Sequence, residues 1–215
     1  MKNLVEVKNL KKKYGAKEAV KGISFNIKQN EILGLLGPNG CGKTTTIGMM
    51  LGLLKPTDGE ILIDGKKIEE NRIETLEKIN FISPYIELPK KLTVKQNLIV
   101  YCKLYNVSDI SDRIEYLVEK LKLKDLLNKI TGELSSGQKN RASLAKALIN
   151  NPTVLFLDEP TASLDPEIGD YIRSFLEDYK KEKKISILLA SHNMNEVTRL
   201  CKTVLMMKDG MIIDK

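Results

Sequence analysis

The chain has 215 residues, 42% of them hydrophobic, and a formal net charge of +7. This length suffices for one large domain or two small ones built on an ordinary apolar core. No apolar run reaches the roughly 18 residues needed to span a bilayer, and the N-terminal segment lacks the apolar core of a signal peptide. We therefore expect a soluble, globular, cytosolic chain rather than a membrane-spanning or secreted one.

The positive charge could serve nucleic acid or an acidic membrane surface, but its distribution favours neither. The lysines are spread along the chain, and the aromatic stacking motifs of RNA-binding proteins are missing. The densest run, residues 180–184, lies where a helix C-terminus is expected, and cations stabilise that end of a helix. Cys41, Cys102 and Cys201 are far apart and odd in number, which fits a reducing compartment. No nucleic-acid partner is expected.

The N-terminal part of the chain has the pattern of a β-sheet. Residues 4–7 and 19–27 alternate apolar and polar side chains, as half-buried antiparallel strands do. Tyr14 lies in the predicted turn between them. It is either an aromatic platform for an adenine ring or an ordinary tyrosine on the rim of a strand, and spacing alone does not separate the two.

A glycine-rich segment after the next apolar run fits the spacing of a phosphate-binding P-loop. Residues 31–36 before it have the length of a buried strand, and residues 44–54 have the composition of a buried helix. Glycines at such a turn let backbone N–H groups at a helix N-terminus converge on a polyphosphate. The loop consists of Gly37, Pro38, Asn39, Gly40, Cys41, Gly42, Lys43, Thr44 and Thr45.

Two side chains of this loop carry chemistry. Lys43 places a positive charge on the β and γ phosphates, and Thr44 offers a hydroxyl to Mg²⁺. The motif predicts a bound nucleotide without specifying which one.

The middle of the chain changes from strands to helices. The Asp64-Gly65 pair predicts a hairpin after residues 60–63. Apolar residues within 98–105 and 114–121 recur at i, i+3, i+4 and i+7, so we expect two amphipathic helices in a small inserted subdomain. A third helical pattern follows residues 134–138.

Two carboxylates follow the continuous apolar run of residues 154–157. A fully buried parallel strand gives such a run, and ligands in α/β sheets sit at the carboxyl ends of strands. Asp158 is suited to hold Mg²⁺ through water, and Glu159 is suited to take a proton from an attacking water. A solvated strand end would explain one acid more easily than two.

His192 is the only histidine of the chain and follows another buried strand, residues 185–190. A lone histidine is often structural, but at this end of a sheet it can hydrogen-bond a γ-phosphate or an attacking water. Asn193 and Glu196 have capping-box spacing for the next helix.

Taken together, these motifs resemble those of the nucleotide-binding subunits of ATP-binding cassette (ABC) transporters, over essentially the whole chain. Residues 134–138 resemble the signature motif, residues 154–159 the Walker B strand, and residues 163–165 the D-loop. His192 matches the switch histidine. The resemblance rests on five motifs that occur in the order and at the separations of the family. A P-loop alone would not be sufficient evidence for it.

The resemblance implies an α/β fold. It consists of a P-loop NTPase core with a mixed, largely parallel sheet, an N-terminal antiparallel β subdomain and an inserted α-helical subdomain. A single ATP-binding domain would span residues 1–215, with the core in residues 1–83 and 152–215. The helical subdomain, residues 84–151, would carry the signature motif.

The resemblance also implies an ATPase that uses ATP and Mg²⁺ and works as a head-to-tail homodimer. Each P-loop would face the partner's signature motif, so that Ser135, Gly137 and Gln138 contact the γ-phosphate of the partner's ATP. A helix N-terminus there would point its dipole at the anion. Asp165 would help to organise the water across the dimer, and Tyr14 matches the adenine-stacking aromatic.

Within one site, the implied catalytic residues are Glu159, His192 and Lys43. Lys43 and Mg²⁺ would offset phosphate charge, Glu159 would orient or deprotonate the water, and His192 would hold the γ-phosphate.

Two departures from the family pattern stand out. Ser136 replaces the usual first glycine of the signature motif. Pro84 stands where the Q-loop normally carries glutamine, which places in doubt a side-chain contact to Mg²⁺ and part of the route to a membrane partner. Ser83 and Glu87 are the alternative substitutes.

Three function classes follow. The leading one is an energy-coupling subunit that drives separate transmembrane transporter subunits from the inner face of the cell membrane; residues 92–98 weakly resemble exporter-type subunits. The alternative is a soluble ABC ATPase acting on ribosomes, nucleic acid or cofactor assembly. A P-loop kinase or GTPase is the third, and the signature motif argues against it.

Overall fold

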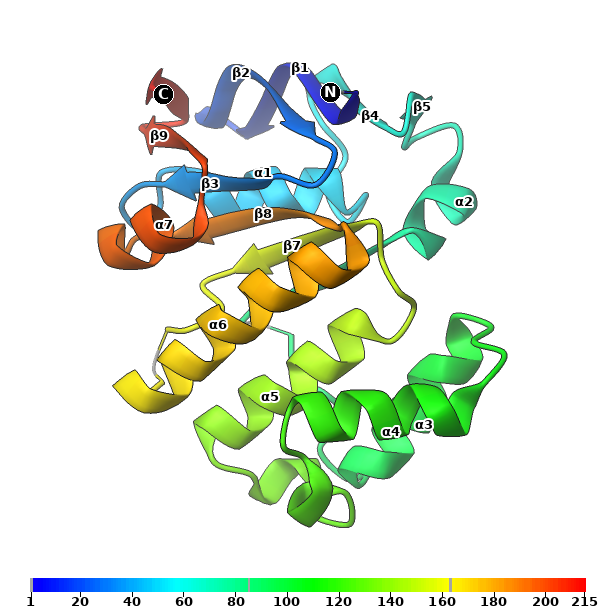
Figure 1. Cartoon of the computed structure of the whole chain (residues 1–215). Helices are drawn as coiled ribbons and strands as arrows, with labels where there is room; N and C mark the ends of the chain where they lie inside the picture. The colour runs from blue at the N-terminus through cyan, green and yellow to red at the C-terminus, as the bar shows by residue number, and fades with distance from the viewer. Residues whose placement is uncertain (1, 85, 163) are drawn as a thin grey trace.

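The computed structural model describes residues 2–84, 86–162 and 164–215 (Figure 1). The strands are β1 (Asn3–Tyr14), β2 (Lys17–Lys28), β3 (Ile32–Leu36), β4 (Asp58–Ile63), β5 (Lys66–Lys67), β6 (Ile79–Ile82), β7 (Val154–Asp158), β8 (Ser186–Ser191), β9 (Thr203–Lys208) and β10 (Met211–Asp214). The helices are α1 (Lys43–Met50), α2 (Arg72–Glu77), α3 (Val94–Leu104), α4 (Ile110–Lys120), α5 (Ser136–Leu148), α6 (Pro166–Lys183) and α7 (Met194–Leu200), with short 3-10 turns η1 (Lys124–Leu126) and η2 (Thr131–Glu133).

The N-terminal strands form the predicted antiparallel sheet, in the order β2-β1-β4-β5. Alternate side chains of β1 and β2, among them Val5, Val7 and Ile27, are buried in one hydrophobic cluster. The hairpin predicted at Asp64-Gly65 joins β4 to β5. Tyr14 is the last residue of β1, so the turn itself begins at Gly15.

The second sheet has the order β10-β9-β3-β8-β7-β6 and is parallel except for β10. Alternate residues of β7 enter different hydrophobic clusters. Val154 and Phe156 pack with the antiparallel sheet and α1, whereas Leu155 and Leu157 pack with the helical part of the chain. Both faces of β7 are therefore covered, which explains its continuous apolar run. The mixed, largely parallel sheet is confirmed.

The P-loop helix is shorter than predicted. The expected helix over residues 44–54 ends at Met50, and Gly52 takes a left-handed φ of 64°. The N–H groups of Leu53 and Leu54 both donate to the carbonyl of Gly48, which closes the chain back onto the helix end. A glycine in this conformation terminates helices because it carries no Cβ that would clash.

The two amphipathic helices predicted in the middle of the chain are α3 and α4, and the third is α5. Figure 1 shows them grouped at the end of the molecule opposite the antiparallel sheet and both termini. Their buried residues Leu98, Leu117 and Leu144 share one cluster with Leu157 and Leu189 of the parallel sheet. Because one apolar cluster crosses the expected boundary, the division at residues 84–151 stays a prediction.

The helix after His192 is capped differently from the prediction. Asn193 Oδ1 accepts from the backbone N–H groups of Asn195 at 3.0 Å and Glu196 at 3.4 Å. The Glu196 carboxylate does not return to the backbone of Asn193, and it accepts instead from the hydroxyls of Thr161 and Ser191. The predicted capping box is therefore wrong for Glu196 and correct for Asn193.

Within the described part of the chain, none of the helices combines the length and the apolar character that crossing a bilayer requires.

Candidate active site

The P-loop connects β3 to α1 in a close-fitting backbone turn. Gly42, at the N-cap of α1, has a left-handed φ of 113°. A Cβ at Gly37 would lie 2.2 Å from the carbonyl oxygen of Met207 on β9. Only glycine fits at these two positions, because one needs the left-handed conformation and the other needs the backbone contact. The loop is thus fixed against β9 at the carboxyl end of β3.

Lys43 is held inside this loop. Its side chain is 5% exposed, and Nζ donates to the carbonyl oxygens of Gly37 at 2.6 Å and Pro38 at 3.2 Å. The same Nζ lies 3.8 Å from Oε1 of Glu159. Two loop carbonyls and the Glu159 carboxylate therefore lie around the ammonium group that we expect to engage phosphates.

Asp158, the last residue of β7, contacts Thr44 in the first turn of α1. The Thr44 hydroxyl donates to Asp158 Oδ2 at 2.9 Å, and Asp158 is 1% exposed. Burial raises the pKa of Asp158, and hydrogen bonds from the Thr44 and Ser83 hydroxyls oppose that rise. The sequence prediction that these two groups face one site is consistent with this geometry.

Glu159 lies one residue beyond the end of β7 and adopts a left-handed φ of 50°. A non-glycine residue in this region is strained unless its surroundings hold it. Its N–H donates to the carbonyl of Ala190 at 2.9 Å, which ties it to β8. Its Oε2 lies 2.9 Å from Nδ1 of His192. The two residues predicted to act on water therefore form a direct pair.

The acidic pair fits a bound magnesium ion. Among the described residues, Asp158 Oδ1 and Glu159 Oε1 are buried and accept no hydrogen bond. A buried acceptor without a donor is costly and normally has a partner. Carboxylate and hydroxyl oxygens are the ligands that Mg²⁺ prefers. Asp158 and Thr44 therefore fit the role of holding the ion.

The signature residues lie at the start of α5. Ser135 is the N-cap, with its Oγ accepting from the N–H of Gln138 at 3.4 Å, and Gln138 Oε1 accepts from the N–H of Ser135 at 3.1 Å. The helix begins at Ser136, inside the predicted signature motif of residues 134–138 rather than after it. The side chains of Ser135 and Gln138 thus form a capping box. A Cβ at Gly137 would lie 3.0 Å from the side chain of Ile168 on α6.

Two further predicted residues have local partners. Asp165 is the N-cap of α6 and accepts from the N–H of Ile168 at 3.0 Å. Ser163, the first residue of the predicted D-loop, lies outside the described residues. Tyr14 is 48% exposed, and Lys12 Nζ lies 5.2 Å from the centre of its ring. Neither contact decides the role predicted for Asp165 or Tyr14.

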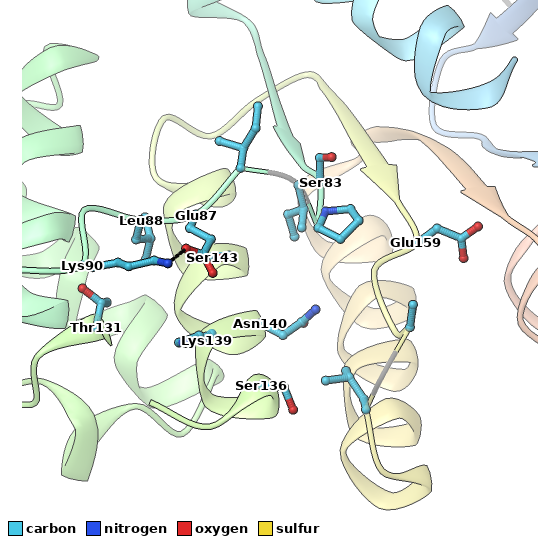
Figure 2. A pocket seen from close by; sticks show the side chains of 15 residues that line it. Ser83, Glu87, Leu88, Lys90, Thr131, Ser136, Lys139, Asn140, Ser143 and Glu159 are labelled. Atoms are coloured by element: carbon cyan, nitrogen blue, oxygen red, sulfur yellow. Dashed lines mark ion pairs between the residues drawn. The ribbon is translucent and has the colours of Figure 1, made fainter. Parts of the chain in front are cut away.

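A cleft of about 210 Å³, with Glu159 in its lining, lies between the end of β6, α5 and the segment that follows β7. Figure 2 shows Asn140 pointing from α5 toward that segment, and its amide donates to the carbonyl of Pro160 at 2.6 Å. Glu87 pairs with Lys90 at the cleft's rim. Of the two candidates for the missing Q-loop glutamine, Ser83 is the one whose hydroxyl reaches Asp158.

Asn140 was not identified from the sequence. It is an ordinary polar residue of a helix, and only the fold brings it to the loop after Glu159. The same holds for Thr161 and Ser191, whose hydroxyls meet on Glu196.

A comparison with protein families decides the identity of this arrangement. The family model described as "ABC transporter" matches residues 20–162, which include the P-loop, the signature motif and both acids. The chain belongs to the ABC transporter family. The predicted resemblance is confirmed, and we refer to the chain as the cassette.

Named relatives place the cassette among transport proteins. It is 37% identical over 212 residues to "Nod factor export ATP-binding protein I" of Burkholderia orbicola, covering 96% of the cassette and 68% of that protein. It is 35% identical over 218 residues to "Bacitracin transport ATP-binding protein BcrA" of Bacillus licheniformis, covering 100% of the cassette and 70% of the relative. The predicted function, an ATP-binding and ATP-hydrolysing subunit that powers a membrane ABC transporter, is confirmed.

Solved structures confirm the fold. The "Dimeric Structure of MJ0796, a Bacterial ABC Transporter Cassette" matches with a TM-score of 0.90 and 27% identity, over 98% of the cassette and 97% of that chain. The cbiO1 protein of Clostridium perfringens is described as part of the ABC transporter complex cbiONQ. It matches with a TM-score of 0.86 and 34% identity, over 100% of the cassette and 88% of the cbiO1 chain. A post-hydrolysis form of MJ0796 holds ADP and Pi. It matches with a TM-score of 0.89 and 28% identity, over 98% of the cassette and 97% of the MJ0796 chain.

Proposed function

We propose that the cassette hydrolyses ATP in a Mg²⁺-dependent reaction, as a homodimer closed by ATP, and that it couples this cycle to separate transmembrane subunits. The observation that carries the proposal is the convergence of Lys43, Asp158, Glu159 and His192 at the carboxyl ends of three adjacent parallel strands. Ligands of open α/β sheets bind at that edge.

The residues of the chain divide the chemistry between them. Lys43 leaves the carbonyls of Gly37 and Pro38 for the phosphates, whose charge it offsets. Glu159 accepts a proton from, or orients, the attacking water, and His192 holds the γ-phosphate. Thr44 and Asp158 hold Mg²⁺, which when bound neutralises the charge of the β and γ phosphates. The backbone N–H groups of the loop from Gly37 to Thr45 cradle the phosphates.

The second half of each site comes from the partner copy. Ser135, Gly137 and Gln138 at the start of α5 would face the partner's γ-phosphate, and Asp165 would order the water across the dimer. The dimeric form of a solved relative supports this proposal. Tyr14 would stack on the adenine.

The relatives support a membrane partner. Their names describe export and transport, and one solved relative is part of a multi-protein transporter complex. We therefore place the cassette on the cytoplasmic face of the cell membrane, held by transmembrane subunits, with no nucleic-acid partner. Residues 84–151 would act as the helical subdomain that transmits the motion.

Phosphate release from ATP tests the proposal. Purified cassette should hydrolyse ATP in Mg²⁺, and EDTA should abolish the activity. Glu159→Gln should lose at least about 100-fold in kcat, which is the lower end of the range that a general base contributes. Glu119→Gln, which changes an exposed acid on α4, is the matched control and should keep wild-type activity. Undiminished hydrolysis in EDTA or in Glu159→Gln would contradict the proposal.

A further inference from the structure

One buried carboxylate joins the two loops that carry Glu159 and His192. Glu196, on α7, is 2% exposed. Its Oε1 accepts from the hydroxyl of Thr161 at 2.6 Å, and its Oε2 accepts from the hydroxyl of Ser191 at 2.7 Å. These separations are typical of hydrogen bonds from a hydroxyl to an ionised carboxylate, which are about twice as strong as neutral ones.

The two hydroxyls belong to the loops of the reacting residues. Thr161 follows Glu159 by two positions, and Ser191 immediately precedes His192. Glu159 Oε2 and His192 Nδ1 lie 2.9 Å apart. The same two loops are therefore joined twice, once through the reacting side chains and once through Glu196.

Glu196 also supports the strained backbone at Glu159. That residue holds a φ of 50°, and the N–H of Ala162 donates to its carbonyl at 3.2 Å, which closes a turn containing Thr161. A backbone in this region persists only where its surroundings fix it. The bond from Thr161 to Glu196 anchors the turn from outside.

The second loop is anchored in the same way. Ser191 Oγ donates to Glu196 and accepts from the N–H of Asn193 at 3.0 Å, so it fixes the residues on both sides of His192. The side chain of His192 itself is 53% exposed. Its orientation depends on the backbone beneath it.

The burial of the Glu196 carboxylate does not by itself favour folding. Among the described residues, Glu196 forms no ion pair within 4.0 Å, so its charge is held by hydroxyl donors rather than by a cation. Transfer of a carboxylate out of water is unfavourable unless hydrogen bonds replace those it made to water. An apolar side chain would fill the site without that cost but would hold neither loop.

We propose that Glu196 is a positioning residue for ATP hydrolysis, which sets the placement of Glu159 relative to His192 through Thr161 and Ser191 without touching the nucleotide. The proposal rests on the roles proposed above for Glu159 and His192. Misplacement of reacting groups by about 1 Å costs up to about 100-fold in rate. The expected effect therefore falls on kcat rather than on nucleotide binding.

The test compares isosteric variants of the bridging hydroxyls. Thr161→Val and Ser191→Ala each remove one hydroxyl, and Thr161→Ser retains it. We expect kcat to fall by about 10- to 100-fold in the first two, while the KM for ATP changes by less than about twofold. Thr161→Ser should keep at least about half of the wild-type kcat, because its hydroxyl still reaches Glu196.

A double-mutant cycle adds a second readout. Glu196→Gln breaks the same network, so Thr161→Val combined with Glu196→Gln should lose little more than the worse single variant. Independent, multiplying losses would contradict a shared network. Thermal unfolding of each variant shows whether it is folded at the assay temperature.

Two outcomes would overturn the inference. Wild-type kcat in folded Thr161→Val and Ser191→Ala is one, and a loss in Thr161→Ser equal to that in Thr161→Val is the other. Glu159→Gln, assayed in parallel, separates this failure from that of the proposed function. If Glu159→Gln is inactive while Thr161→Val is fully active, only the positioning role fails; if Glu159→Gln stays active, both proposals fail.

Discussion

The Glu159 carboxylate lies between the side chains of His192 and Lys43. Its Oε2 is 2.9 Å from His192 Nδ1, and its Oε1 is 3.8 Å from Lys43 Nζ. Binding of a triphosphate would draw both groups toward the phosphates. Nucleotide binding would thus release the Glu159 carboxylate from both contacts and allow it to hydrogen-bond the attacking water.

His192→Ala tests this exchange. The variant should bind ATP nearly as well as the wild type, because Lys43 and the loop N–H groups supply the affinity. Its kcat should fall by about 100-fold, since one stabilising donor at the γ-phosphate is lost. Equilibrium binding of a fluorescent nucleotide and phosphate release separate the two quantities. Equal losses in both would make His192 a binding residue only.

Lys43→Ala should impair binding and hydrolysis together. The buried ammonium is the nearest compensation for phosphate charge, and each charge-assisted hydrogen bond contributes about 1.5–3 kcal/mol, so nucleotide affinity should fall by about 10- to 100-fold or more. Lys95→Ala, which removes an exposed lysine of α3, is the control and should behave as the wild type. Normal ATPase activity in Lys43→Ala would contradict the assignment.

Asp158→Asn should stabilise the nucleotide-free protein while it abolishes hydrolysis. Burial raises the pKa of Asp158 in the native protein. Above that pKa the buried charge lowers the free energy of unfolding. At a pH where the carboxyl is protonated in both the native and the unfolded states, it has no such effect. The variant should be more stable than the wild type at pH 7, and the difference should shrink as the pH falls into the range where the carboxyl is protonated in both states. Urea unfolding at pH 7 and in that lower range measures the difference; a loss of stability at pH 7 would show that the carboxylate favours folding.

Lys146 makes the free energy of unfolding depend on pH in the alkaline range. It is 8% exposed, with Nζ 3.2 Å from the carbonyl of Phe81 and 4.5 Å from that residue's ring centre. Desolvation lowers its pKa to about 8, below the ordinary value of 10.5. Between these values the unfolded chain binds more protons than the native chain, so stability rises with pH, by at most about 3 kcal/mol.

Chemical unfolding between pH 7 and pH 10 measures this contribution. Lys146→Met should lack the rise, and the exposed-site control Lys95→Met should keep it. The same pH dependence in Lys146→Met and in the wild type would assign the effect to other groups.

The sequence predicts those parts of the site that are contiguous in the chain. The P-loop, the acids after β7 and His192 after β8 each follow an apolar strand, and the parallel sheet brings these strand ends together. Burial of both faces makes such strands easy to recognise. The convergence of these residues could therefore be predicted from the sequence, and their roles stay predictions.

Other features depend on contacts between distant segments. Glu196 has capping-box spacing, yet its partner Thr161 lies 35 residues away, and no local pattern reveals that bond. The end of α1 depends on the conformation of Gly52. The short α2 was not predicted because Thr75 is its only buried residue in the described chain, which leaves no apolar periodicity to detect.

The measurement that tests the account most directly is the oligomeric state of Glu159→Gln with saturating ATP and Mg²⁺, by sedimentation velocity. With hydrolysis disabled, each copy should lend its signature residues to the other's nucleotide, so the account predicts a dimer with ATP and a monomer with ADP. Lys43→Ala under the same conditions should stay monomeric. A Glu159→Gln protein that binds ATP and still sediments only as a monomer would contradict the central claim.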